Sequence, residues 1–132
     1  MDKGVCEIFE VGPRDGLQNE AREIPVSEKI ALVDLLSRAG FSRIEVASFV
    51  SPKWVPQMVG SGEVLGGIAR VEGVRYAALT PNMRGYEDAV AAKAGEIAVF
   101  ASAQMRSSAA ATPTGPSVLG NVMSISLERQ PR

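Results

Sequence analysis

The sequence predicts an α/β fold in which strands and helices alternate, and three observations support this class. Short apolar runs at 5–11, 43–47, 74–79 and 96–100 have the length and composition of buried strands. Helix-forming segments separate them, at 26–40, at 63–70 and after Asn82. The resulting β-α-β-α-β-α-β order is typical of parallel strands joined by helical crossovers.

The three helices differ in how clearly the sequence defines them. In 26–40, apolar residues recur at helical spacing, Ser27 is expected to cap the start and Gly40 to end the helix. The segment 63–70 is weaker because it contains two glycines. Asn82 is expected to cap the third helix. We expect all three helices to lie on one side of a curved sheet, because crossovers between parallel strands are right-handed.

The pattern permits a doubly wound sheet or a β/α barrel. A complete barrel needs eight βα units and about 250 residues. Four predicted strands therefore correspond to at most about half of a barrel.

The character of the sequence changes near Ala103. We divide the chain into a domain of about four βα units at 1–103 and an atypical tail at 104–132. The tail contains no aromatic residue, its basic residues are all arginine, and "SSAAATPTGPS" has the composition of a linker. This composition is typical of an out-of-frame reading of GC-rich coding sequence, so we expect a truncated or frameshifted product. We expect the tail to be disordered or poorly packed, with no fifth strand joined to the fourth.

Composition narrows the class of protein. The chain has 132 residues, 45% of them hydrophobic, and a net charge of −1, which suit one domain and give no basic stripe for nucleic acid. No apolar run reaches the length of a membrane span, and the start leaves no room for a signal peptide. With a single cysteine the chain forms no disulfide framework, and a reducing, cytoplasmic location is expected. Because histidine is absent, a bound metal would need oxygen ligands, which suits magnesium or manganese.

Polar side chains follow three of the predicted strands, where functional groups gather in parallel α/β folds. They are Arg14, Asp15 and Gln18 after the first strand, Glu45 and Ser48 at the end of the second, and Thr80 and Asn82 after the third. We expect them to face one common mouth.

The residue types support one chemistry. Asp15 offers a hard oxygen ligand for a divalent cation, and Arg14 offers a planar fork for a carbonyl or carboxylate oxygen. Glu45 could orient Arg14 across the mouth. A cation and an arginine on the same oxygen would stabilise an enolate, the charge that develops when a C–C bond next to a carbonyl breaks.

Structural alternatives remain open for each residue. Arg14-Asp15 could be a solvated turn pair, Glu45 a surface acid and Asn82 a plain helix cap. Cys6, in an apolar run, is expected to be a core residue. Trp54 could cover an edge of the core or line a pocket.

Three of these stretches, "VGPRDGLQNE", "IEVASFVSPKWVPQM" and "LTPN", resemble hydroxymethylglutaryl-CoA lyase, in order over 5–103. An R-D-G turn is also found in related barrel lyases and synthases, and "SFVSPKWVPQM" indicates this member. The resemblance implies a metal-dependent (β/α)8 TIM barrel that cleaves 3-hydroxy-3-methylglutaryl-CoA to acetyl-CoA and acetoacetate, in leucine degradation. It implies a small-molecule acyl-CoA partner and a homo-oligomer in the full-length family.

The resemblance also implies roles for residues of this chain. Asp15 corresponds to a ligand of Mg or Mn, Arg14 to the arginine that contacts the substrate carbonyl, and Glu45 to the acid that positions this arginine. Gln18 and Asn82 are expected to bind substrate. The family's other metal ligands, a His-x-His pair and an asparagine, and its catalytic cysteine come from later strands. The chain contains no histidine, and Cys6 does not match that cysteine.

The missing groups leave two further readings open. One is a related barrel lyase or synthase acting on acyl-CoA or oxo-acid substrates. The other is a non-catalytic truncated fragment that persists as a binding or assembly piece.

Overall fold

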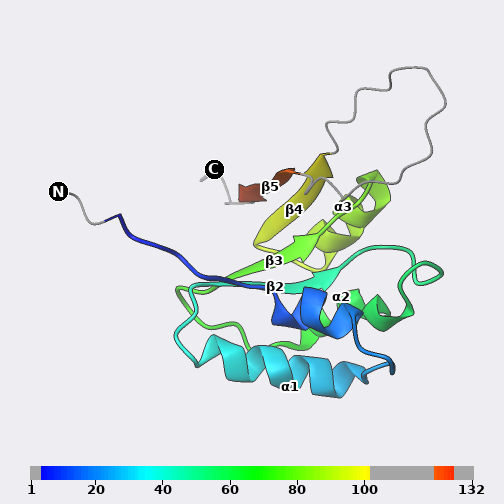
Figure 1. Cartoon of the computed structure of the whole chain (residues 1–132), viewed down its shortest axis with the longest axis horizontal. Helices are drawn as coiled ribbons and strands as arrows, with labels where there is room; N and C mark the ends of the chain where they lie inside the picture. Colours follow the sequence, from blue (N-terminus) through cyan, green and yellow to red (C-terminus); the bar gives the residue numbers. More distant parts are fainter. Residues whose placement is uncertain (1–3, 102–120, 127–132) are drawn as a thin grey trace, which may run out of the picture.

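The protein forms a five-stranded sheet with helices between the strands (Figure 1). The structure is a computed structural model that describes residues 4–101 and 121–126. The strands are β1 (Phe9–Glu10), β2 (Arg43–Ser48), β3 (Arg75–Leu79), β4 (Glu96–Ala101) and β5 (Asn121–Ser126). The helices are α1 (Val26–Ser37), α2 (Ser61–Gly67) and α3 (Met83–Ala91), with a π-helical turn η1 (Gly12–Gly16) and a 3-10 turn η2 (Pro56–Met58).

The first four strands pair in parallel in chain order, which confirms the predicted topology. The ladder between β2 and β3 contains an irregularity between Glu45 and Ala47. The first strand is much shorter than the predicted 5–11. Its extension is wrong because Val5 and Ile8 lie outside the sheet, 98% and 64% exposed, and because the chain turns into η1 directly after Val11.

The expectation that no fifth strand joins the fourth is wrong. Strand β5 pairs with β4 in antiparallel orientation, from Glu96 opposite Ser126 to Ala101 opposite Asn121. The segment contains the β-branched residues Val122 and Ile125, which favour strands, and a six-residue ladder supplies partners to backbone groups along β4. Residues 102–120 and 127–132, including the linker-like 107–117, lie outside the described residues.

One face of the sheet packs against all three helices. Core residues of β2, β3 and β4 form a single cluster with residues of α1, α2 and α3, among them Val33, Ile44, Leu65, Tyr76, Ala89 and Ile97. Burying each large apolar side chain of such a cluster contributes about 1.5–3 kcal/mol. The predicted placement of the helices on one side of the sheet is confirmed.

Helix boundaries follow local sequence with two differences. Helix α1 begins at Val26 after Pro25, so Ser27 is not its cap, and Gly40 adopts a positive φ of 98° just beyond its end. Helix α2 begins two residues earlier than predicted. The cap of α3 is confirmed, because the backbone N–H of Gly85 donates to Asn82 Oδ1 at 2.8 Å.

Ion pairs occupy the beginnings of the strands. Arg43 donates to the buried carboxylate of Glu96, and its guanidinium lies 4.0 Å from the centroid of the Phe9 ring. Arg75 pairs with Glu7, which joins the N-terminal segment to β3. The contacts of Phe9 and Glu7 hold the N-terminal segment beside β2 and β3.

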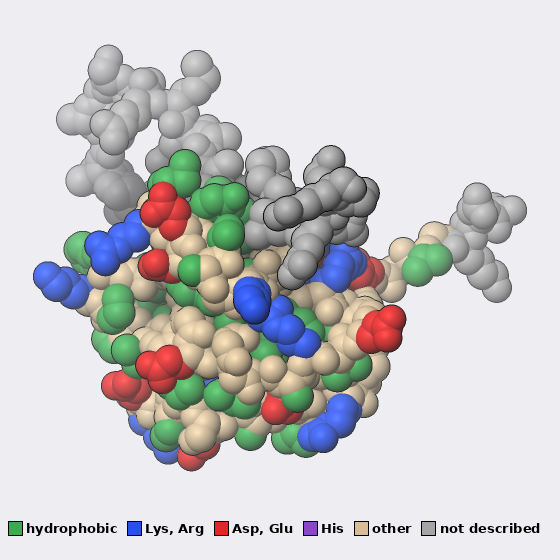
Figure 2. Space-filling view, turned by 180° about the vertical axis from the view of Figure 1, so that it is seen from behind, with side chains coloured by type: hydrophobic (Ala, Val, Ile, Leu, Met, Phe, Trp, Pro, Cys, Tyr) green, Lys and Arg blue, Asp and Glu red, His purple; other side chains and the backbone are tan. Residues whose placement is uncertain are grey.

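The surface mixes both signs of charge. Figure 2 shows Lys and Arg side chains interspersed with Asp and Glu on one face of the molecule. Within residues 4–101 and 121–126, no helix is long and apolar enough to span a membrane.

Candidate functional site

Glu45 is buried in the sheet, with only 2% of its surface exposed. The alternative of a solvated surface acid is therefore excluded. It follows Ile44, whose side chain belongs to the helix-facing core, so the alternation of β2 directs Glu45 to the opposite face. Burial raises the pKa of this carboxyl above its ordinary value, and the hydrogen bond from Arg14 opposes that rise.

Arg14 reaches Glu45 from the turn after β1. Backbone N–H groups of Arg14 and Asp15 both donate to Val11 O, at 3.1 and 2.7 Å, which fixes the direction of η1. A Cβ at Gly12 would lie 2.6 Å from Glu10 Oε1, the atom that accepts the Gly12 N–H, so a larger residue there would displace the Glu10 carboxylate.

The Arg14 side chain is 14% exposed, and its Nε donates to Glu45 Oε1. Thirty-one residues separate this pair in the sequence, so the fold brings the two side chains together. The prediction that Glu45 orients Arg14 agrees with this geometry.

Asp15 lies on the solvent side of the same arginine. Its Oδ1 is 3.2 Å from Arg14 Nη1, and its side chain is 56% exposed. The carboxylate is therefore accessible to an ion from solvent. Within the described residues no group of three or more His, Cys, Asp or Glu side chains gathers around a possible metal. Asp15 fits one position in a coordination shell and not a complete metal centre.

In the described part of the chain, no hydrogen bond or ion pair joins the other predicted site residues to Arg14 or Glu45. Gln18 is half-buried in the turn after η1. Ser48 is buried, and its backbone oxygen accepts a hydrogen bond from Ser61 Oγ. The Thr80 hydroxyl donates to Ala98 O at 3.4 Å within the sheet. Asn82 follows β3 as predicted, but its side-chain oxygen caps α3.

Two single residues differ from expectation. The prediction of Cys6 as a core residue is wrong, because Cys6 is exposed in the segment that β1 does not reach. Trp54 is 83% exposed, so it does not cover an edge of the core. It lies in the turn where the Trp54 N–H donates to Ser51 O at 2.9 Å.

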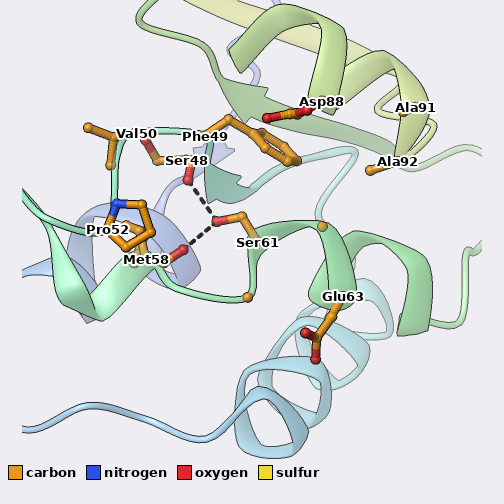
Figure 3. Close-up of a pocket in the computed structure, with 12 residues that line it drawn as sticks. Ser48, Phe49, Val50, Pro52, Met58, Ser61, Glu63, Asp88, Ala91 and Ala92 are labelled. Atoms are coloured by element: carbon orange, nitrogen blue, oxygen red, sulfur yellow. Dashed lines mark hydrogen bonds between the residues drawn. The ribbon is translucent and has the colours of Figure 1, made fainter. Parts of the chain in front are cut away.

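A cavity of about 470 Å³ lies beside the end of β2, between α2 and α3 (Figure 3). Ser61, at the start of α2, donates from its hydroxyl to Ser48 O and Met58 O, both at 2.7 Å. Phe49 and Asp88 line one side, and Glu63 belongs to the other. The sequence analysis did not single out Ser61, the first residue of α2, two positions before Glu63. Neither Arg14 nor Glu45 lines this cavity.

The Arg14–Glu45 pair holds a guanidinium in one orientation at the end of the first strand. The Glu45 carboxylate accepts a hydrogen bond from Arg14 Nε and so fixes the plane of the guanidinium, while Arg14 Nη1 donates to Asp15 Oδ1. Arginine carries five N–H donors, so further donors remain for an oxygen at the mouth. Aligned donors of this kind stabilise negative charge that develops on an oxygen.

Comparisons with known proteins indicate the family of this chain. The family model described as HMGL-like matches residues 5–113. A lyase of Pseudomonas aeruginosa for 3-hydroxy-3-isohexenylglutaryl-CoA and hydroxy-methylglutaryl-CoA is 62% identical over 96 residues, covering 73% of this chain and 32% of that protein. Mitochondrial hydroxymethylglutaryl-CoA lyase of Rattus norvegicus is 57% identical over 97 residues, covering 74% of this chain and 30% of that one. The chain thus spans about a third of the length of these relatives.

Solved structures agree. A crystal structure of hydroxymethylglutaryl-CoA lyase from Pseudomonas aeruginosa superposes with a TM-score of 0.70 at 61% identity, over 72% of this chain and 32% of that one. An HMG-CoA lyase from Acinetobacter baumannii, in complex with coenzyme A and 3-methylmalate, gives 0.68 at 47% identity, over 69% of this chain and 30% of that one. The parallel strands with their helices correspond to part of a (β/α)8 barrel. Over most of its length the chain is similar to HMG-CoA lyases. The chain belongs to the HMGL-like family.

Proposed function

We propose that Arg14, Asp15 and Glu45 form one wall of a lyase site that cleaves 3-hydroxy-3-methylglutaryl-CoA to acetyl-CoA and acetoacetate, a reaction of leucine degradation. The observation that carries the proposal is the buried ion pair between Arg14 Nε and Glu45. A surface turn has no need of a carboxylate that is 2% exposed, because burying a charge is costly. Holding an arginine in one orientation accounts for that cost.

Each residue has a defined part. Arg14 donates to the substrate oxygen that becomes negatively charged when the C–C bond breaks, and it transfers no proton. Glu45 fixes the plane of the guanidinium, so little reorganisation is needed as the charge develops. Asp15, whose Oδ1 lies 3.2 Å from Arg14 Nη1, would supply one oxygen ligand to a divalent ion.

The cofactor we propose is Mg²⁺ or Mn²⁺. When bound, such an ion would withdraw charge from the same oxygen as Arg14. A hard cation of this kind prefers six oxygen ligands. This chain contributes Asp15 within its described residues and contains no histidine, so we expect its own affinity to be weak, roughly millimolar.

A chimera tests the proposal. Residues 5–101 of this chain replace the corresponding segment of the Pseudomonas aeruginosa lyase, to which the chain is 62% identical over 96 residues. We expect the chimera to release acetoacetate from 3-hydroxy-3-methylglutaryl-CoA. Arg14→Ala in the chimera should lower kcat by roughly 10²–10³-fold, the usual effect of removing one donor to an oxyanion.

The matched control is Arg22→Ala. Arg22 is 72% exposed, and its ion pair with Glu28, at 3.7 Å, lies at the surface. It should leave kcat unchanged. A folded chimera that releases no acetoacetate would contradict the substrate and favour a related barrel lyase or synthase. Equal activity of the Arg14→Ala and Arg22→Ala chimeras would contradict the role of Arg14.

A further inference from the structure

Lys29 is a buried lysine on α1, with 5% of its surface exposed. Its ammonium donates to two backbone carbonyls, Gln57 O at 2.6 Å and Val59 O at 2.9 Å. Burial lowers the pKa of Lys29, and the charge of Glu23 opposes this shift. Lysine is rarely buried unless it is paired, so these two hydrogen bonds need an explanation.

Both carbonyls belong to the loop of residues 49–60, which joins the end of β2 to α2. This loop packs closely on α1. A Cβ at Gly60 would lie only 2.6 Å from Val26 Cγ2, and Gly60 has a positive φ of 78° that favours glycine. The Lys29 ammonium therefore binds the loop of residues 49–60 where its backbone lies close to α1.

The loop is also joined to the segment after β1. Gln57 Nε2 donates to Glu20 O at 3.1 Å, and the Glu20 N–H donates to Leu17 O at 3.2 Å. Lys29 holds the backbone of Gln57, and the Gln57 side chain holds the turn that follows η1. A continuous chain of hydrogen bonds thus links α1 to the loops after β1 and β2.

We propose that Lys29 is a positioning residue that restrains the loop of residues 49–60 and the turn containing Glu20 relative to each other, beside the Arg14–Glu45 pair. The connection between these segments is inferred from geometry alone. Its importance for catalysis rests on the proposed function. Arg14 lies in η1, just before the turn that contains Glu20, and Glu45 lies in β2, which leads into the loop of residues 49–60. Independent motion of these two segments would disturb the alignment of Arg14 with Glu45. Lys29 touches neither residue and acts through backbone carbonyls.

Amide hydrogen exchange on the full chain tests this connection. The Met58 and Val59 N–H groups, bonded to Val55 O and Pro56 O, report on the loop after β2. The Glu20 N–H reports on the loop after β1. Lys29→Met removes two charge-assisted hydrogen bonds, so exchange at all three amides should accelerate by roughly ten- to hundredfold.

Three further variants separate the links. Lys29→Arg keeps a cation with donors and should restore most of the protection. Gln57→Ala keeps the carbonyls that accept from Lys29, so it should accelerate Glu20 and leave Met58 protected. Lys93→Met, on an exposed lysine after α3, should change none of these amides.

A merely structural lysine would give a different pattern. Failure of Lys29→Met to fold, or equal acceleration of these amides and those of β2 and β3, would overturn the proposal, as would unchanged exchange at Met58 and Val59. The exchange measurement does not depend on turnover. If the chimera fails to show lyase activity, the exchange rates still test the connection made by Lys29 separately.

Discussion

Arg14→Ala should destabilise the chain in a strongly pH-dependent way. The substitution leaves Glu45, 2% exposed, without the guanidinium that pairs with it. Breaking a buried ion pair by removing one partner costs about 3–5 kcal/mol. The carboxyl can avoid part of this cost by taking up a proton, which costs about 1.36 kcal/mol for each pH unit above its unfolded pKa of 4.5.

The cost of protonating Glu45 sets the expected loss of unfolding free energy. At about pH 7 protonation costs about 3.4 kcal/mol, so the variant should lose roughly 3 kcal/mol of unfolding free energy. At about pH 5 the same route costs about 0.7 kcal/mol, so the loss should fall below about 1 kcal/mol. The sign follows from the raised pKa, because the folded variant then binds more protons than the unfolded chain and becomes less stable as pH rises.

Urea unfolding followed by far-UV circular dichroism at both pH values measures the effect. Arg22→Ala is the control, because its 3.7 Å pair with Glu28 is exposed and should contribute at most about 0.5 kcal/mol. Arg14→Ala combined with Glu45→Gln should lose the pH dependence. A loss at neutral pH that matches Arg22→Ala, or one that is the same at both pH values, would refute the reasoning.

Three further predictions concern stability. Leu65→Ala should cost about 2–5 kcal/mol in urea unfolding because Leu65 is fully buried, whereas Leu35→Ala, at a position 62% exposed, should cost about 0.5 kcal/mol or less; similar costs would contradict the described core. Asn82→Ala should cost about 1 kcal/mol by removing the acceptor of the Gly85 N–H, with Asn82→Asp close to wild type, and equal losses for both would contradict the cap. Burial lowers the pKa of Lys29 below 10.5, so at alkaline pH below that value the folded chain binds fewer protons than the unfolded chain. The unfolding free energy of the wild type should therefore rise relative to that of Lys29→Met as pH increases in this range. A difference that does not change with pH would contradict the shift.

The order of strands and the meeting of Arg14 with Glu45 could be predicted from sequence because local patterns locate the strands and their ends. Apolar runs of strand length alternate with helical periodicity, and parallel strands place their ends at one edge of the sheet. A turn directly after one strand and an acid within the next are therefore brought near each other. Asn82 was predictable as a cap for the same reason, since capping depends on three neighbouring residues.

The remaining features depend on contacts between distant segments. Residues 121–126 contain strand-forming residues, but nothing local identifies β4 as their partner. Cys6 lies in an apolar run whose neighbours did not become a strand, so local hydrophobicity gave the wrong environment. The burial of Lys29 follows from two carbonyls about thirty residues away, and the composition of α1 carries no sign of them.

The central claim is that this chain carries one wall of a lyase site and not the whole of it. The most direct measurement is acetoacetate release from 3-hydroxy-3-methylglutaryl-CoA by the purified 132-residue chain, with excess magnesium or manganese and Asp15→Ala as the control. One carboxylate from the described residues, without histidine, is too few ligands to hold a hard cation firmly, so we predict no detectable release. Turnover by the chain that disappears in Asp15→Ala would contradict the claim and establish a complete active site within these residues.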